Sequence, residues 1–210
     1  LYILDPKNSD LADLGTVMPN VYHIKEEMID CVNAFYEGMV QRSEQMKRHP
    51  NYKTGENYAY LGLPPCFLIF DEYVAFFEML GTKESVNLLS QLKKIVMLGR
   101  QAGYFLIVAC QRPDAKYFSD GIRDNFNFRV GLGRISELGY GMLFGSDVKK
   151  QFFQKRIKGR GYCDVGTSVI SEFYTPLVPK GHDFLQTIGS LAQARQDGTA
   201  TCEAKGDGTD

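Results

Sequence analysis

The sequence contains no tryptophan and only three histidines in 210 residues, at positions 23, 49 and 182. That spacing fits no histidine-based metal motif. The five cysteines are odd in number and include no C-x-x-C pair, so we expect neither a disulfide framework nor a zinc ribbon, and a reducing compartment. No apolar run approaches the roughly 18–20 residues that span a bilayer, and no signal peptide is recognisable. We therefore expect this segment to make no membrane contact.

A charge excess of either sign is also absent, because 24 basic residues face 25 acidic ones. The total charge thus neither predicts nor excludes a nucleic-acid partner, and only the local distribution of charge is informative. Hydrophobic residues make up 44% of the chain, which is enough for a folded core. The first residue is Leu1 rather than methionine, and it opens an apolar run, so we expect a piece of a longer protein.

Short apolar runs alternate with helical patterns along the first half of the chain. The runs at 2–4, 66–70 and 104–110 end at polar residues, and the last two do not alternate with polar positions, which is typical of strands buried on both faces of a parallel sheet. Helical spacing of apolar residues covers 25–48 and about 83–101. This order predicts an open α/β fold with a largely parallel sheet and helices on both faces.

The second half of the sequence predicts smaller elements. We expect a short helix at 121–125, a third strand at 128–132, a helix at 136–144, and a peripheral hairpin formed by 161–164 and 169–174. From about residue 196 the chain is rich in Gly, Thr and Asp, and we expect it to be disordered.

Two adjacent carboxylates, Asp71 and Glu72, follow the apolar run at 66–70. Ligands of open α/β sheets bind at the carboxyl ends of the strands. Asp71 is suited to hold Mg²⁺ through water, and Glu72 to activate a water for attack on a γ-phosphate. An acidic helix cap explains the same residues equally well. Gln111, at the next strand tip, would lie beside them and sense the phosphate. For Asp5 and Lys7 a structural turn and a ligand role are equally good explanations.

The densest basic stretch lies at 149–160, where six of twelve residues are Lys or Arg and none is acidic. Within it, Lys155, Arg156 and Lys158 are candidates for contact with a DNA backbone, and a solvated surface is the alternative. Arg112 and Lys116, in the loop after the run at 104–110, are the rival candidates.

Five motifs occur in a fixed order over about residues 1–175. They are Leu4-Asp5-Pro6-Lys7, Phe67-Leu68-Ile69-Phe70-Asp71-Glu72, Gly99-Arg100-Gln101-Ala102-Gly103 running into Ala109-Cys110-Gln111-Arg112-Pro113, Ile122-Arg123-Asp124-Asn125 with Phe128-Arg129-Val130, and Lys158-Gly159-Arg160-Gly161-Tyr162. In this order they resemble the motor domain of the FtsK/SpoIIIE family of DNA translocases, particularly its conjugative coupling-protein branch from Gram-positive mobile elements.

The resemblance implies a RecA-like P-loop ATPase core, with residues 1–180 as a partial motor domain and 181–210 as a C-terminal segment. It makes Asp71 and Glu72 the Walker B pair and Gln111 the sensor. It implies a homo-hexamer around DNA, which hydrolyses ATP with Mg²⁺ between subunits. An arginine from the neighbouring subunit would complete the site, and Arg123, Arg129 and Arg134 are the candidates.

The resemblance also implies a place in the cell and a process. The family works at the cytoplasmic face of the bacterial membrane, with any anchor outside this segment, and its conjugative branch serves a relaxase or other conjugation proteins. We therefore expect a fragment of an ATP-dependent DNA translocase for conjugative transfer. One alternative is a chromosome-segregation or sporulation translocase of the same family. Another is a nucleotide-free interaction module that docks on a complete ATPase.

One family motif is absent: no G-x-x-x-x-G-K-[ST] string occurs in these 210 residues. That Walker A loop supplies the backbone amides and the lysine that hold the phosphates. Because its strand is central in the family's fold, we expect its absence to leave a gap in the sheet.

The missing loop generates a first prediction. Calorimetric titration of this 210-residue chain with Mg-ATP should give no binding heat, because the amide cradle for the phosphates is absent. Binding in the micromolar range would contradict it.

Overall fold

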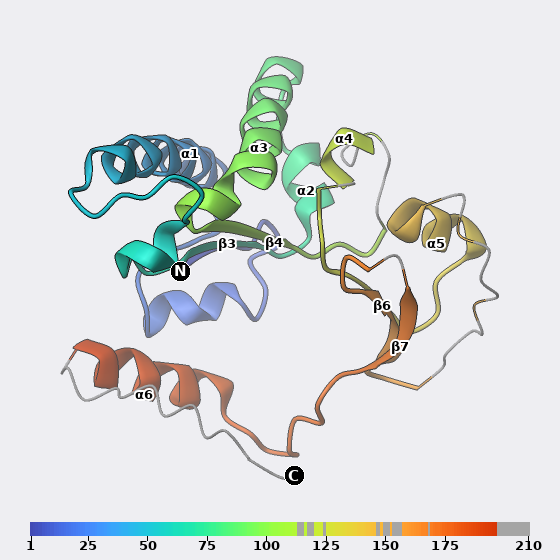
Figure 1. Cartoon of the computed structure of the whole chain (residues 1–210). Helices are drawn as coiled ribbons and strands as arrows, with labels where there is room; N and C mark the ends of the chain where they lie inside the picture. Colours follow the sequence, from blue (N-terminus) through green and yellow to red (C-terminus); the bar gives the residue numbers. More distant parts are fainter. Residues whose placement is uncertain are drawn as a thin grey trace, which may run out of the picture.

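The computed structural model describes residues 1–112, 116, 120–123, 125–145, 148, 152, 157–167 and 169–196 (Figure 1). In these residues the chain forms short strands, α-helices and two 3₁₀ turns. In chain order they are β1 (Tyr2–Leu4), η1 (Ala12–Thr16), β2 (Val21–Tyr22), α1 (Lys25–Arg48), η2 (Tyr58–Leu61), β3 (Cys66–Phe70), α2 (Tyr73–Glu78), α3 (Thr82–Ala102), β4 (Tyr104–Val108), α4 (Asp120–Arg123), β5 (Arg129–Leu132), α5 (Glu137–Phe144), β6 (Arg160–Asp164), β7 (Ile170–Tyr174) and α6 (Phe184–Gln196).

The first four strands form one parallel sheet in the order β2-β1-β3-β4. Strand β3 pairs with both β1 and β4, and in this register Leu4 lies opposite Phe70, which lies opposite Val108. Parallel pairing was predicted from the uninterrupted apolar runs, and the structure confirms it. The carboxyl ends of β1, β3 and β4 consequently lie at one edge of the sheet.

The main core lies between this sheet and the long helices α1 and α3, which cover one face (Figure 1). From β3, Leu68 and Phe70 point into it and are fully buried. They meet Met28 and Phe35 of α1 and Leu92 of α3. Each buried aliphatic or aromatic side chain of this kind contributes roughly 1.5–3 kcal/mol relative to leaving it exposed.

The other face of the sheet is less covered than the sequence predicted. Phe67 and Phe105 stack on it with ring centroids 5.3 Å apart, yet both remain half-buried, and Ile107 is 47% exposed. The expectation that these strands are buried on both faces is therefore wrong for the described residues. Apolar composition alone does not reveal this, because a run such as Phe67–Leu68–Ile69 looks the same whether one or both of its faces are covered.

Helix boundaries follow local signals in the sequence. Helix α1 has Glu26 and Glu27 in its first turn and Lys47 in its last, which suits the helix dipole, and it ends before Pro50. Helix α3 ends at Gly103, whose φ of +76° lies in the left-handed region that favours glycine. Both predicted helices are confirmed.

The strand predicted at 128–132 forms, but it does not join the parallel sheet. It is β5, which pairs antiparallel with β6, and β6 pairs with β7, so the predicted hairpin is the larger part of a separate three-stranded sheet. A second small core of Tyr140, Phe144, Tyr162 and Ile170 supports it. Sequence patterns assign a strand but not its partner, because pairing depends on tertiary contacts.

Two helices were not predicted. Helix α2 follows Glu72 directly and buries Tyr73, Phe76 and Phe77 in the main core. Helix α6 returns toward the beginning of the chain, where Gly189 packs against Val17 (Figure 1). Disorder was expected from about residue 196. Gln196 is the last residue of α6, and the residues after it lie outside the described ones.

The tight junction of α3 with β4 generates a stability prediction. A Cβ on Gly99 would lie 2.2 Å from the carbonyl oxygen of Tyr104, so Gly99→Ala forces the helix away from the strand. We expect it to lower the free energy of unfolding by roughly 1–3 kcal/mol in urea titrations.

Gly141→Ala in α5 is the matched control, because a Cβ there meets nothing within 4 Å. Alanine replaces glycine in a helix, so stability should stay the same or rise by up to about 1 kcal/mol. Equal stability of the two variants would contradict the close approach at Gly99.

Candidate functional site

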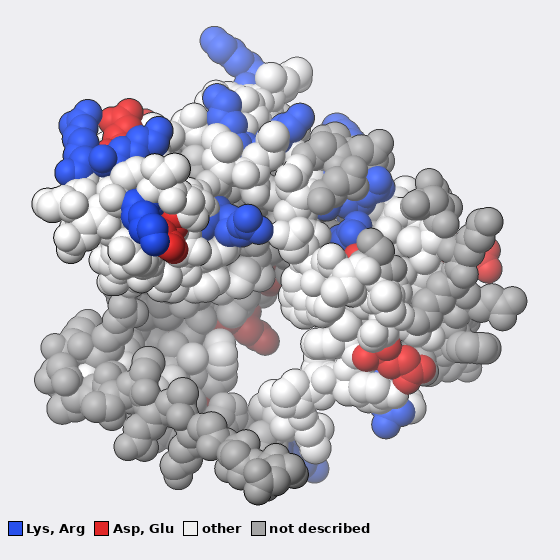
Figure 2. Space-filling view, viewed as in Figure 1, with Lys and Arg blue, Asp and Glu red and all other residues white. Residues whose placement is uncertain are grey.

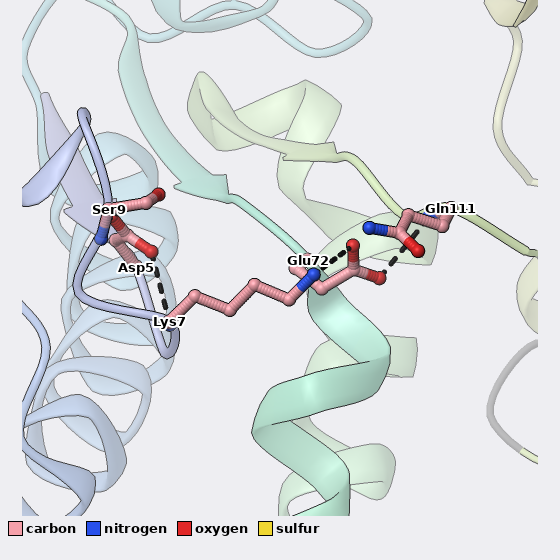
Figure 3. Close-up of polar contacts among 5 residues, drawn as sticks. All are labelled: Asp5, Lys7, Ser9, Glu72 and Gln111. Atoms are coloured by element: carbon pink, nitrogen blue, oxygen red, sulfur yellow. Dashed lines mark hydrogen bonds and ion pairs between the residues drawn. The ribbon is translucent and has the colours of Figure 1, made fainter.

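The predicted polar residues converge at the carboxyl edge of the parallel sheet. Figure 3 shows Asp5 and Lys7 after β1, Glu72 after β3 and Gln111 beyond β4, with their polar contacts. Asp71 joins them through the backbone, because its N–H donates to the carbonyl of Leu4 at 2.9 Å. Residues far apart in the sequence are adjacent here because the three strands run parallel.

Asp5 has a structural task at this edge. Its side chain is fully buried, and its carboxylate accepts four hydrogen bonds. The donors are the N–H groups of Lys7 at 3.1 Å, Ser9 at 2.7 Å and Ala12 at 3.0 Å, and the Ser9 hydroxyl at 2.9 Å. A buried carboxylate is stable only when it is satisfied in this way. The turn after β1 is therefore fixed by Asp5, and Lys7 is fixed with it.

The side chain of Glu72 does not cap a helix in the described contacts. Glu72 is the N-cap residue that directly precedes α2, with φ +49° and ψ +60°, and its side chain accepts from no backbone N–H of that helix. Its Oε2 instead accepts from Lys7 Nζ at 3.0 Å, and its Oε1 accepts from the backbone N–H of Gln111 at 3.2 Å. The left-handed backbone costs a residue with a side chain roughly 1–2 kcal/mol, and such strain is typical of functional sites. The carboxylate thus spans the ends of all three strands.

Asp71 lies in an environment with an excess of negative charge. Burial raises the pKa of its carboxyl, and the carboxylates of Asp5 and Glu72 raise that pKa further, while the N–H of Glu72 and the charge of Lys7 lower it. A divalent cation bound at Asp71 would relieve this repulsion, so the donor set suits Mg²⁺. The described residues hold no group of three or more His, Cys, Asp or Glu that could hold a metal ion.

Gln111 reaches Glu72 through its backbone rather than through its amide side chain. The side chain is exposed and lines a cavity of about 490 Å³ between the end of β4 and β5. Arg123, Arg129 and Arg134, the three arginine candidates, line the same cavity. The three arginines lie close together in the sequence, and in the structure all three border this one cavity.

The three arginines differ in their partners. Arg129 donates from Nη2 to Asp164 at 2.8 Å and from Nη1 to the carbonyl of Leu143 at 3.3 Å, and Asp164 is buried. Arg123 lies 3.5 Å from the carbonyl of Met142. Arg134 is exposed. Breaking a buried ion pair such as that of Arg129 costs about 3–5 kcal/mol, so this arginine is the least available for another role.

The gap expected from the missing Walker A strand does not lie among the four described parallel strands. All four described parallel strands are contiguous, and the free position lies at the outer edge of β4, which pairs only with β3 among them. The cavity described above opens beside this edge. The Walker A strand was expected between two strands of the sheet. A strand added at the free edge of β4 would leave the pairing of β4 with β3 unchanged.

Three of the five DNA-binding candidates lie among the described residues. Arg112 and Lys158 are exposed, while Lys116 lies 3.9 Å from Glu78 in an ion pair. Lys155 and Arg156 lie outside the described residues. On the face drawn in Figure 2, described basic side chains occur in several separate places, and some of them adjoin acidic ones.

Lys7 is the site residue that sequence reasoning left undecided. Its distance of 65 positions from Glu72 hides the contact. A signal was present, because Asp5-Pro6-Lys7 follows an apolar run just as Asp71 and Glu72 do, and parallel strands bring such ends together.

A parallel sheet with paired carboxylates at its carboxyl edge is an α/β arrangement of the kind in which ligands bind beyond the strand ends. No family model matches the chain. Over 209 residues, however, the chain is 54% identical to the FtsK domain-containing protein YdcQ of Bacillus subtilis strain 168, covering 99% of this chain and 43% of that protein. The predicted resemblance is thereby confirmed: the chain is similar over nearly its whole length to a protein named for its FtsK domain, and it spans less than half of that protein's length.

Solved structures agree on the fold. The pCW3 conjugation coupling protein TcpA, a monomer form with ATPγS, matches 90% of this chain and 56% of its own with a TM-score of 0.71 and 18% identity. The cytoplasmic domain of the Thermomonospora curvata Type VII secretion ATPase EccC matches 91% of this chain and 24% of its own with a TM-score of 0.62 and 18% identity. The predicted α/β fold of P-loop ATPase motor domains is confirmed. No helix in the described part is both long and apolar enough to cross a membrane.

The raised pKa of Asp71 generates a prediction about stability and pH. The folded chain binds the proton of Asp71 more tightly than the unfolded chain, so ionised Asp71 opposes folding at neutral pH. Asp71→Asn should therefore raise the free energy of unfolding at pH 7. The gain should shrink as the pH falls through the raised pKa, and vanish below the unfolded value of about 4.

Urea unfolding at a series of pH values measures this effect. Asp30→Asn on the exposed side of α1 is the control, and it should change stability by less than about 0.5 kcal/mol. A loss of stability in Asp71→Asn at pH 7 would refute the charge argument.

Proposed function

We propose that this chain is the hydrolytic part of an ATP-dependent DNA translocase that acts in conjugative transfer. One observation carries the proposal: Glu72 is held at the carboxyl edge of the sheet, beside Asp71, with its carboxylate fixed between the ends of β1 and β4. The similarity to a protein named for its FtsK domain and the fold of P-loop ATPases support it.

Glu72 is the general base in this proposal. A carboxylate has about four acceptor positions on its two oxygens, and the contacts with Lys7 and Gln111 use two of them. The remaining positions accept a hydrogen bond from a water. As the water oxygen bonds to the γ-phosphorus and the bond to the ADP oxygen breaks, Glu72 takes the water proton and later releases it to solvent. The products are ADP and inorganic phosphate.

Asp71 holds Mg²⁺ through water in this proposal, and the ion would supply positive charge to the β- and γ-phosphates. Its charge repulsion with Asp5 and Glu72 favours a cation at this place. In this proposal the phosphate cradle would come from a Walker A loop outside these 210 residues.

Gln111 and one arginine complete the site. Gln111 senses the γ-phosphate from the tip of β4. Among the arginines we favour Arg134 as the residue that reaches a neighbouring subunit, because it is exposed while Arg129 is held by Asp164. Such an arginine neutralises charge in the transition state. This assignment requires self-association, and a homo-hexamer is the assembly we propose.

DNA as the substrate, a relaxase or another conjugation protein as a further partner, and a place at the cytoplasmic face of the membrane belong to the same proposal. The similarity in fold to a conjugation coupling protein supports conjugation. Arg112, Lys116 and Lys158 are the described candidates for DNA contact, and Lys155 and Arg156 extend that set. A chromosome-segregation or sporulation translocase is the alternative within the family. A nucleotide-free interaction module is the alternative outside it.

The experiment uses the full-length protein that contains this chain. Glu72→Gln should lower the turnover of ATP by at least about 100-fold while ATP still binds, because only the proton acceptor is lost. Asp71→Ala should weaken binding of Mg-ATP as well. Steady-state hydrolysis and equilibrium binding of a fluorescent ATP analogue measure the two effects.

Glu37→Gln on the exposed side of α1 is the control and should retain the parental rate. Parental turnover in Glu72→Gln would remove the proposed base. Adding DNA in the same assay separates the alternatives, because a DNA translocase is stimulated and a nucleotide-free module shows no turnover at all.

A further inference from the structure

Among the described residues, Lys7 is the one that forms an ion pair with Glu72. Its Nζ lies 3.0 Å from Glu72 Oε2, and the two side chains are 43% and 13% exposed (Figure 3). The ammonium is therefore partly in solvent, while the carboxylate it contacts is nearly enclosed. Contact of the ammonium with solvent limits what the pair adds to stability.

The turn that carries Lys7 is built more firmly than a surface loop requires. Asp5 is fully buried and accepts the N–H of Lys7 itself, and it also fixes the backbone of Ser9 and Ala12. The backbone of this turn is further tied to the next strand, because the N–H of Asp71 donates to Leu4. The origin of the Lys7 side chain is thus fixed relative to the residue that precedes Glu72.

Glu72 meets a second fixed group on its other oxygen. The N–H of Gln111 donates to Oε1, and that N–H belongs to backbone that continues from β4. With one donor on each oxygen, the plane of the carboxylate is set from two sides. The left-handed backbone of Glu72 sets the start of the same side chain.

We propose that Lys7 is a positioning residue for Glu72, which holds the carboxylate in the orientation from which it takes a proton from water. The inference rests on the proposed function, because it concerns the same base. Lys7 does not accept the proton, and its ammonium leaves acceptor positions on Glu72 open for water. A catalytic carboxylate that is free to rotate spends little time in the reactive geometry, and the reaction is slower as a result. By restricting this rotation, Lys7 would raise the rate.

This assignment differs from two others that the same lysine allows. A lysine that binds the phosphates directly would contribute to nucleotide affinity. A lysine that blocks Glu72 would slow hydrolysis, and its removal would speed it. Positioning affects turnover alone and in the opposite direction, because without Lys7 the base is present but poorly oriented.

The experiment measures ATP hydrolysis by full-length variants. Lys7→Met should lower kcat at least tenfold and change KM for ATP by less than about twofold. Lys7→Arg should restore part of kcat, because a guanidinium can also donate to Glu72 Oε2. In a Glu72→Gln background, Lys7→Met should lower the residual rate by less than twofold, since there is no carboxylate left to orient.

Lys25→Met is the matched control. Lys25 pairs with Glu84 at the same distance of 3.0 Å, from α1 to α3 and away from the site. It should leave kcat unchanged, and thermal melting should show both lysine variants folded at the temperature of the assay. A tenfold fall in kcat only in Lys7→Met therefore excludes a general loss of structure.

Other outcomes overturn the inference. A large rise in KM at unchanged kcat means that Lys7 binds the phosphates, and a rise in kcat means that it blocks the base. If Lys7→Met lowers the rate equally in the parental and in the Glu72→Gln background, Lys7 acts on a group other than Glu72. Parental activity of Glu72→Gln would instead refute the proposed function itself, and the two failures are thus distinguishable.

Discussion

Parallel pairing of β1, β3 and β4 is the constraint on which the candidate site depends. Each strand contributes one polar tip, and only a parallel arrangement brings three tips to one edge. The register aligns the three tips. Leu4 lies opposite Phe70, and Phe70 lies opposite Val108, so the residues that follow them leave the sheet at the same level. Packing by α1 and α3 holds this register, because the side chains facing them are buried in one core.

The charges at this edge of the sheet reduce the stability of the folded chain. Three carboxylates meet one lysine, burial raises the pKa of Asp71, and Glu72 has a left-handed backbone. The surrounding structure compensates for this: Asp5 is fully hydrogen-bonded, and α2 buries three aromatic rings directly after Glu72. Unfavourable local terms of this kind persist where rigid neighbours enforce them, which is the pattern of a functional site.

The separate antiparallel sheet gives the second half of the chain a different role. It places β5 and the arginines across a cavity from the end of β4, rather than in the parallel sheet itself. The open edge of β4 lies beside the same cavity. Gln111 borders the cavity, and its backbone N–H contacts the carboxylate of Glu72.

The sequence alone determined the long elements and the identity of the paired carboxylates. Helices α1 and α3 and strands β1, β3 and β4 follow from apolar periodicity and from breakers such as Pro50 and Gly103, which act within a few residues. Five motifs in series were enough to identify the family, because their order is far more specific than any one of them. The local structural pattern was thus readable without a structure.

Only the tertiary structure decided how distant segments meet. It showed that β5 pairs with β6, that one face of the parallel sheet is partly open, and that Arg129 is held by Asp164. It also turned Lys7 from an undecided turn residue into a contact of Glu72. These facts depend on which residues become neighbours after folding, and the energy of a contact between positions 7 and 72 leaves no trace in the local pattern of either segment.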